Sequence, residues 1–264
     1  MSKKIVFFDI DGTLVDCVNG LDYLTDYTKK ALKKLKDEGH YIFIASGRPY
    51  GYLLKELLEF NFDGYILCDG AYILFHGKEI GYHPIDKEEI RFMFEQAKNK
   101  NMTYVGYDKK YAYFFNDDGR FLEYSHKFNF NDQFIGKIGN YEEMVDKFLK
   151  IHICCRNDRD FKEFVLHEDK FNCANDNNFY LKEIYSKQYN KATALKEILD
   201  YTGLNLEDSY FFGDGLNDIE MMGAIGHAIA MDNAVEEVKS HADYICKSVS
   251  DDGVADFIFN SGLF

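Results

Sequence analysis

The sequence has only two prolines among 264 residues, and its basic residues are outnumbered, with 31 Lys and Arg against 45 Asp and Glu. So few prolines argue against a proline-rich linker. The net charge of −14 argues against a nucleic-acid partner, because such proteins bind phosphate with an excess of Lys and Arg. No apolar run approaches the ~18 residues of a membrane span, so we expect no membrane partner. The remaining composition is that of a globular protein with one or two domains.

The cysteines show no pattern that indicates a metal site or a redox site. None of the six cysteines forms a C-x-x-C pair, and none has zinc spacing with histidine. We expect them to be small buried side chains in a reducing compartment. The first ten residues lack the longer apolar stretch of a signal peptide, so we expect a cytoplasmic protein.

Strand and helix patterns alternate in the first part of the chain. Apolar runs over 4–8, 41–45 and 65–68 predict strands, and helical periodicity over 21–35 and 50–60 predicts helices between them. Strands separated by helices at this spacing form a parallel sheet with crossover connections. The same alternation returns after residue 190, so we predict an α/β fold built on a Rossmann-like parallel sheet.

The middle of the chain has a different composition. Residues 84–186 contain 21 of the 44 Phe and Tyr residues, and with 19 acidic and 16 basic residues they carry −3 of the net charge, leaving −11 for the rest. Their strand and helix patterns are those of an α+β domain. We therefore expect a core domain formed by residues 1–83 and 187–264, and an inserted α+β domain formed by 84–186.

Two aspartates follow the first predicted strand directly. Asp9 and Asp11 come at the carboxyl end of that strand, where open parallel sheets bind their ligands. Gly12 permits the tight turn that brings both carboxylates to the same crevice. Such a pair attracts a hard cation, and Mg²⁺ prefers a few carboxylates together with phosphate oxygens. The alternative, a helix cap or turn, accounts for one aspartate better than for two.

Three further groups lie at strand ends or beside them. Ser46 and Gly47 follow the second strand and are expected to open a helix, where a hydroxyl and backbone N–H groups bind anions or cap the helix. Lys191 begins a predicted long helix, and taken alone it would be read as a surface lysine. The run 213–218, Gly-Asp-Gly-Leu-Asn-Asp, follows a buried strand and supplies a further carboxylate.

Taken together, these groups resemble the motifs of the haloacid dehalogenase superfamily of phosphatases. The order is paired aspartates, hydroxyl, lysine and aspartate, with an inserted α+β domain between the hydroxyl and the lysine. This plan resembles the Cof-type subfamily with a class IIB cap, and the resemblance covers essentially the whole chain. Further similarities are the runs 69–71 (Asp-Gly-Ala), 231–234 (Met-Asp-Asn-Ala) and 252–255 (Asp-Gly-Val-Ala).

The resemblance implies a role for each motif residue. Asp9 is expected to be the nucleophile that forms an aspartyl-phosphate, and Asp11 the general acid and base. The cofactor Mg²⁺ would be held by Asp9, the main-chain carbonyl of Asp11 and Asp214. The phosphate would be bound by the Ile10 N–H, the Ser46 hydroxyl, the Gly47 amide, Lys191 and Asn217. Asp218 would orient Lys191.

The chain departs from the family pattern at three positions. Ser46 stands where the family commonly has Thr, which preserves the hydroxyl. Asp69 stands where Asn is common, and a carboxylate there would repel phosphate unless it points away, so no role is assigned to Asp69. Lys191 is followed by Ala192, where Gly is common.

The sequence leaves several functional alternatives open. The resemblance implies hydrolysis of a small phosphorylated metabolite, most of all a sugar phosphate, with the inserted domain determining specificity. A phosphosugar mutase would use the same core, but such relatives usually have an arginine-rich cap. A non-catalytic sugar-phosphate-binding or phospho-acceptor protein is the third possibility. We expect a monomer or a weak homo-oligomer.

Overall fold

The computed structural model describes residues 2–127 and 140–264, and these form two compact units. The core unit comprises Met1–Gly47, Leu54–Gly81 and Asn190–Phe264, and the inserted unit comprises Arg48–Leu53 and Tyr82–Tyr189. The short segment Arg48–Leu53 groups with the inserted unit because the Tyr52 ring packs edge-on against Tyr107, with ring centroids 5.2 Å apart. The expected boundaries at 83/84 and 186/187 therefore differ from these units by a few residues and by this segment.

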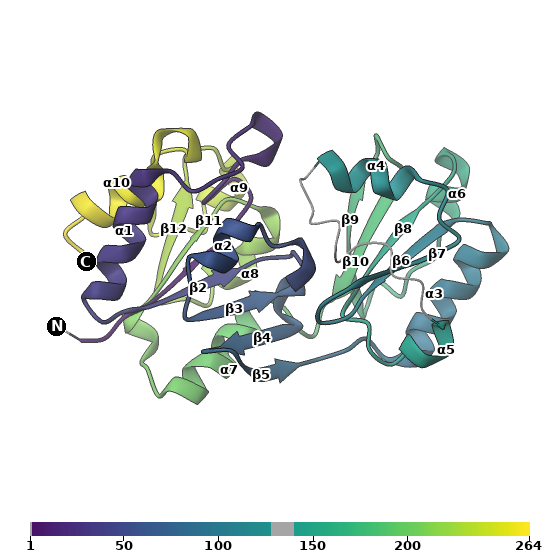
Figure 1. The fold of residues 1–264 in the computed structure, drawn as a ribbon, viewed down its shortest axis with the longest axis horizontal. Coiled ribbons are helices and arrows are strands. Elements are labelled where there is room, and N and C mark those ends of the chain that lie inside the picture. The colour runs from purple at the N-terminus through teal and green to yellow at the C-terminus, as the bar shows by residue number, and fades with distance from the viewer. Residues whose placement is uncertain (1, 128–139) are drawn as a thin grey trace. The chain divides into compact units, whose positions relative to one another are not determined.

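The core unit contains an open sheet in which most strands are parallel (Figure 1). Within the described residues the strand order is β13-β12-β11-β1-β2-β3-β4-β5, and β4 pairs antiparallel with β3. The strands are β1 (Ile5–Phe8), β2 (Tyr41–Ala45), β3 (Gly64–Leu67), β4 (Tyr72–Phe75), β5 (Lys78–Tyr82), β11 (Ser209–Gly213), β12 (His227–Met231) and β13 (Tyr244–Cys246). The predicted α/β fold class with a parallel sheet is confirmed.

The helices of the core unit include two that begin at a side-chain cap. The core-unit helices are α1 (Asp26–Asp37), α2 (Lys55–Glu59), α7 (Lys191–Thr202), α8 (Ile219–Met222), α9 (Glu236–Lys239) and α10 (Gly253–Asn260). In α7, Asn190 and Thr193 form a reciprocal capping box, and Gly203 ends the helix with φ +69°. This cap determines where the helix starts, and thereby places Lys191 in its first turn.

The helix expected over 50–60 is broken in the structure. A 3₁₀ turn covers Tyr50–Tyr52, Leu53 and Leu54 are extended, and only Lys55–Glu59 is α-helical. The break follows directly after Tyr52, whose ring is buried and packs against Tyr107, so the chain leaves the helical path where this ring packs. The predicted helix start beside Ser46 and Gly47 is therefore wrong.

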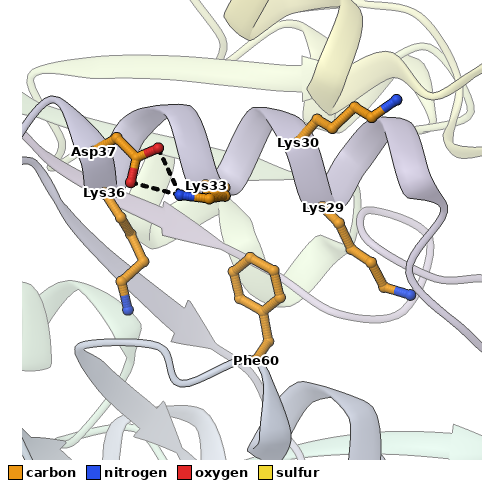
Figure 2. A pocket seen from close by; sticks show the side chains of 6 residues that line it. All are labelled: Lys29, Lys30, Lys33, Lys36, Asp37 and Phe60. Carbon is orange, nitrogen blue, oxygen red and sulfur yellow. Dashed lines mark hydrogen bonds and ion pairs between the residues drawn. The ribbon is translucent and has the colours of Figure 1, made fainter.

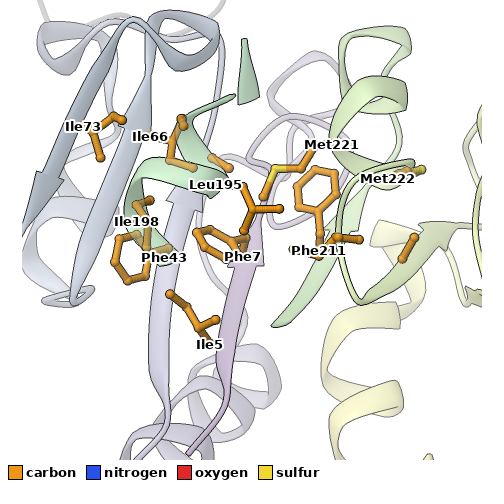
Figure 3. Close-up of a cluster of buried hydrophobic side chains, with 14 of the residues drawn as sticks. Ile5, Phe7, Phe43, Ile66, Ile73, Leu195, Ile198, Phe211, Met221 and Met222 are labelled. Carbon is orange, nitrogen blue, oxygen red and sulfur yellow. The ribbon is translucent and has the colours of Figure 1, made fainter. Parts of the chain in front are cut away.

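Apolar side chains from the central strands form the core of this unit (Figure 3). Phe7, Phe43 and Phe211 lie on neighbouring strands, and Leu195 and Ile198 of α7 pack against them. The strands are buried on both faces, as expected for parallel strands covered by helices. This packing makes the strand ends a rigid platform for the loops that follow.

The inserted unit contains an antiparallel sheet with strand order β7-β6-β8-β10-β9 (Figure 1). The strands are β6 (Thr103–Tyr107), β7 (Ala112–Phe115), β8 (Lys150–Cys154), β9 (Phe171–Asp176) and β10 (Leu181–Ser186), and the helices are α3 (Lys87–Asn99), α4 (Arg120–Lys127), α5 (Tyr141–Met144) and α6 (Asp158–Glu163). On one sheet face Ile151, Ile153 and Ile184 pack with α3, while the other face carries Val105, Tyr107 and Leu181. The unit is α+β.

Candidate active site

The turn after β1 places Asp9 next to the loop that follows β11. The backbone N–H of Asp9 donates to the Phe212 carbonyl at 2.9 Å, which extends the ladder between the two strands by one residue. Gly12 has φ +85°, and a Cβ atom there would lie 2.0 Å from an Asp214 carboxylate oxygen. Glycine is therefore required at position 12 by its conformation and by the close approach of Asp214.

Lys191 joins two carboxylates in the interior of the core unit. Its Nζ atom lies 2.7 Å from Oδ1 of Asp9 and 2.5 Å from Oδ1 of Asp218, and its side chain is 1% exposed. The second oxygen of Asp218 accepts hydrogen bonds from the backbone N–H groups of Asp214 and Gly215, at 3.0 and 2.9 Å. Asp218 therefore holds both the lysine and the loop that carries Asp214.

Asp214 is oriented by two residues that the sequence analysis assigned no role. The Thr13 hydroxyl donates to Oδ1 of Asp214 at 2.8 Å. The Asn233 amide donates to the Gly12 carbonyl at 2.8 Å and lies 3.4 Å from Oδ2 of Asp214. Thr13 follows the paired aspartates directly, and Asn233 belongs to the run 231–234 that supported the family resemblance, so both had a local signal.

Buried carboxylates outnumber cations in this cluster. Oxygens of Asp9, Asp214 and Asp218 all lie within 4.8 Å of one another. Burial raises the pKa of Asp9 well above its ordinary value; Lys191 opposes this, and Asp218 and Asp214 add to it. Burial also raises the pKa of Asp214, to about 7. For Lys191, burial lowers the pKa, but Asp218 and Asp9 outweigh it and raise the pKa overall. The cluster thus carries negative charge that a further cation would balance.

The donor atoms of this cluster fit a small hard cation. Both oxygens of Asp218 are already bound, to Lys191 and to backbone N–H groups. Oδ2 of Asp9 accepts no hydrogen bond from any residue that the structure describes, and an oxygen of Asp9 lies within 4.8 Å of one of Asp214. Carboxylate oxygens are the ligands that Mg²⁺ prefers. Asp9 and Asp214 are therefore the side chains that could hold a divalent metal.

The other predicted residues line neighbouring loops. The backbone carbonyl of the buried Ser46 accepts a hydrogen bond from the backbone N–H of Asp69, at 3.2 Å. Gly47 follows Ser46 in the sequence. Asn217 donates from its amide to Oδ1 of Asp69 at 3.0 Å, so this carboxylate is held by an amide of the site. Asp69 is 3% exposed.

The two residues beside Asp9 differ in exposure. The carbonyl of the buried Ile10 accepts the N–H groups of Leu14 and Val15, at 2.9 and 3.0 Å, which closes the turn. Asp11 is exposed. All the predicted site residues belong to the core unit, and its strand ends bring Asp9, Lys191, Asp214 and Asp218 together.

A separate hollow lined mostly by lysines lies along α1 (Figure 2). The hollow is lined by Lys29, Lys30, Lys33, Lys36, Asp37 and Phe60. Lys33 pairs with Asp37, Lys29 pairs with Glu56, and Lys36 donates to the Asn61 carbonyl. Most of its lysines are thus already engaged, and the hollow offers no carboxylate pair for a metal beside a phosphate.

None of the helices in the described part of the chain has the length and apolar character needed to cross a bilayer.

Comparison with known proteins identifies a family whose model matches this chain. Residues 6–258 match the model of the haloacid dehalogenase-like hydrolases. The chain is 29% identical to "Putative phosphatase YkrA" of Bacillus subtilis, over all of this chain and 99% of the relative. It is 27% identical to the 5-amino-6-(5-phospho-D-ribitylamino)uracil phosphatase YwtE of the same organism, over 97% of this chain and 96% of the relative. The solved structure of the HAD subclass IIB sugar phosphatase BT4131 aligns with a TM-score of 0.83 at 25% identity, covering 99% of this chain and 100% of the other.

Proposed function

The chain belongs to the haloacid dehalogenase-like hydrolases, as its motifs predicted, and on that premise we propose that it is a Mg²⁺-dependent phosphatase of small sugar phosphates. The prediction that the chain is an enzyme of the hydrolase class is confirmed by this family. The observation that carries the proposal is the contact of Lys191 with Asp9, beside the carboxylate of Asp214.

Asp9 is the proposed nucleophile. Lys191 contacts Oδ1 of this residue, and a carboxylate oxygen of Asp9 attacks phosphorus and forms the aspartyl-phosphate while the leaving alcohol departs. Asp11, exposed two residues later, protonates the oxygen of the leaving alcohol. In the second half-reaction Asp11 takes a proton from water, which attacks the same phosphorus and releases phosphate from Asp9.

The remaining site residues bind the phosphoryl group. The Ile10 N–H, the Ser46 hydroxyl, the Gly47 amide, Lys191 and Asn217 are the proposed donors. Asp218 positions Lys191 by accepting from its ammonium group. A carboxylate and a phosphate ester repel each other, so these donors and the lysine lower the barrier by balancing charge at the reacting atoms.

Mg²⁺ would be held by Asp9, Asp214 and the main-chain carbonyl of Asp11, where it would neutralise charge on the phosphate oxygens. Thr13 and Asn233 hold Asp214 in place for this purpose. Asp69 takes a role that the sequence left open: its carboxylate accepts from the Asn217 amide and thereby fixes the direction of that side chain.

The substrate class rests on the relatives. YwtE is named for a substrate whose phosphate is carried on a ribityl chain, and BT4131 is described as a sugar phosphatase. A polyhydroxylated leaving group is common to both names. We propose that the inserted unit determines which of these leaving groups is accepted.

The phosphomutase alternative is disfavoured by the arginines of the inserted unit. A mutase needs free cationic groups that hold a second phosphate. Each described arginine between residues 84 and 186 lies within ion-pair distance of a carboxylate, those arginines being Arg91, Arg120, Arg156 and Arg159. None of the four is thus held ready for a second phosphate.

The test of the proposal is release of inorganic phosphate by the purified full chain from a panel of sugar phosphates, with Mg²⁺ and with EDTA. We expect release with Mg²⁺ and none with EDTA. Binding of these compounds without release would support the non-catalytic alternative. Conversion of glucose 1-phosphate to glucose 6-phosphate without net phosphate release would support the mutase.

A further inference from the structure

A hollow on the surface of the core unit is not used by the proposed chemistry. It lies along α1, encloses about 360 Å³ and is lined by four lysines of that helix, by Asp37 and by Phe60. Figure 2 shows the Phe60 ring pointing towards α1, with Lys29 and Lys36 extending from the helix on either side of it. All of these residues belong to the core unit, so the hollow does not depend on the placement of the inserted unit.

The lysines beside the ring share one face of α1. Lys29, Lys33 and Lys36 are spaced four and three residues apart, which brings their side chains to the same side of a helix. The helical rise spreads them over about 10 Å along the helix axis. The chain as a whole has a net charge of −14, yet this helix carries five lysines against two aspartates. The hollow therefore lies in a locally basic part of an acidic protein.

The segment that carries Phe60 also orients two of these lysines. Nζ of Lys29 lies 2.5 Å from Oε1 of Glu56, which precedes Phe60 by one helical turn. Lys36 donates to the carbonyl of Asn61, which follows Phe60 directly. An ammonium group has three N–H donors, and each of these contacts uses one of them. Both lysines are therefore held beside the ring with donors left for a ligand.

The third lysine can turn from its partner to a ligand at little cost. Lys33 pairs with Asp37 of the same helix, and both side chains are exposed, at 69% and 62%. Exposed pairs of this kind contribute little to stability, because water and salt screen them. The lysines of the hollow outnumber the carboxylates paired with them, which are Asp37 and Glu56. An anion is therefore the kind of ligand that balances the charge of the hollow.

We propose that the hollow binds a nucleotide, with the base stacked on Phe60 and the phosphates held by Lys29, Lys33 and Lys36. Bases stack well on aromatic side chains, and the Phe60 ring is half-buried and lies beside the Phe62 ring, with centroids 5.4 Å apart. The volume of the hollow is that of a small-molecule site. A longer nucleic acid would meet the negative charge of the rest of the protein, so the occupant is a free nucleotide. This binding does not depend on the phosphatase activity proposed above.

The probe is ADP, and its affinity is measured by isothermal titration calorimetry on the full chain in EDTA, so that no metal occupies the core cluster. Lys29→Gln combined with Lys36→Gln removes two ammonium groups from the hollow, and Phe60→Leu removes the ring but keeps an apolar side chain. Lys162→Gln combined with Lys196→Gln is the matched control. It removes the same charge from two exposed lysines that form i,i+4 ion pairs elsewhere.

We expect the Kd of ADP to rise about 10-fold or more in the variant without Lys29 and Lys36, because hydrogen bonds to charged groups are lost. The control protein should bind ADP as the wild type does. Phe60→Leu should raise the Kd of ADP about 5-fold or more and leave that of pyrophosphate unchanged, because only ADP has a ring to stack. Added salt should weaken ADP binding to the wild type, as for a ligand held by exposed charges.

No measurable binding of ADP by the wild type at millimolar concentration would overturn the site. So would an unchanged Kd in both hollow variants, which would place ADP elsewhere on the protein, or an equal rise in the control, which would show attraction by overall charge alone. Pyrophosphate bound as tightly as ADP, with no effect of Phe60→Leu, would overturn the stacking of the base. Thermal unfolding midpoints show whether each variant folds. Where Phe60→Leu does not fold, the lysine variant and its control decide, together with the difference between ADP and pyrophosphate on the wild type.

Discussion

The two buried lysines of this chain lie in clusters that differ in charge balance. Lys191 in the core unit contacts Asp9 and Asp218, and Asp214 lies in the same cluster. Lys150 in the inserted unit forms an ion pair with Glu183. Burial raises the pKa of Asp9 and of Asp214 in the first cluster, whereas Lys150 and His152 lower the pKa of Glu183 in the second. The first cluster therefore gathers several carboxylates that one lysine does not balance, while the carboxylate of the second is stabilised in its ionised form.

The core cluster gives the largest expected effect. Asp9→Asn keeps the shape of the side chain but replaces the nucleophilic oxygen, and it removes the charge that Lys191 pairs with. We expect kcat to fall more than about 10³-fold, as for other catalytic nucleophiles, with the fold retained. Phosphate release and the thermal unfolding midpoint are measured together. Asp200→Asn, at an exposed aspartate of α7, is the control and should have wild-type activity.

A few per cent of residual activity in Asp9→Asn would contradict the assignment of the nucleophile. It would also remove the main difference between the two clusters, since the core cluster would then only bind its ligand.

Substitution of Asp11 separates the acid and base steps from metal binding in the core cluster. In Asp11→Asn the proposed metal ligand, the main-chain carbonyl, is kept, and the acid and base are lost. We expect kcat at saturating Mg²⁺ to fall about 10²- to 10⁴-fold. The Mg²⁺ concentration that gives half-maximal activity should stay at the wild-type value. A change in that concentration with normal kcat would reverse the division of roles.

Substitution of Asn233 is expected to have a smaller effect, and to change only the affinity for the metal. Its amide holds the Gly12 carbonyl and lies 3.4 Å from Asp214, and its own oxygen accepts the Val249 N–H at 2.9 Å. Asn233→Ala should weaken Mg²⁺ binding about 10- to 100-fold, as for other residues that orient metal ligands. The measurement is the rise of the unfolding midpoint with added Mg²⁺. Asn205→Ala, at an exposed residue, is the control, and an unchanged Mg²⁺ dependence in Asn233→Ala would refute the role.

Local patterns in the sequence were sufficient for much of the core unit. The strand over 41–45 has the predicted bounds and the helix predicted to begin at Lys191 does begin there, because apolar periodicity and caps are local signals. Asp9, at the end of β1, and Lys191, in the first turn of α7, then lie in contact. Most of the candidate site could therefore be predicted.

Structural features that depend on residues distant in the sequence were either not predicted or predicted wrongly. The helix over 50–60 is broken where Tyr52 packs against Tyr107, a contact that no local pattern contains. Strand β9 was not predicted, because its Asn-Cys-Ala-Asn-Asp run is polar and it forms by pairing with β10 at the sheet edge. The hydrogen bond from Asn233 to the Gly12 carbonyl spans 221 positions and has no spacing rule.

The smallest expected effect concerns a paired carboxylate whose basic partners are exposed. Glu89 of α3 accepts from Lys170 and lies 2.6 Å from Nδ1 of His167. Burial would raise the pKa of Glu89, but these hydrogen bonds outweigh it and lower the pKa below its ordinary value. The pair with Lys170 resembles that of Lys150 with Glu183 in chemistry, but both partners of Glu89, Lys170 and His167, are more exposed.

A lowered carboxyl pKa means that the unfolded chain binds the proton more tightly than the folded protein does. The stabilisation from Glu89 is therefore complete above the unfolded pKa, about 4.3, and is lost as the pH falls through the lower folded pKa. We expect Glu89→Gln to lower the free energy of unfolding by less than about 1 kcal/mol at pH 7, since its partners are solvent-exposed. The difference from the wild type should shrink as the pH falls from 5 to about 3, as measured by urea unfolding at each pH. A difference that instead grows as the pH falls would show that Glu89 acts by packing rather than by charge, unlike Glu183.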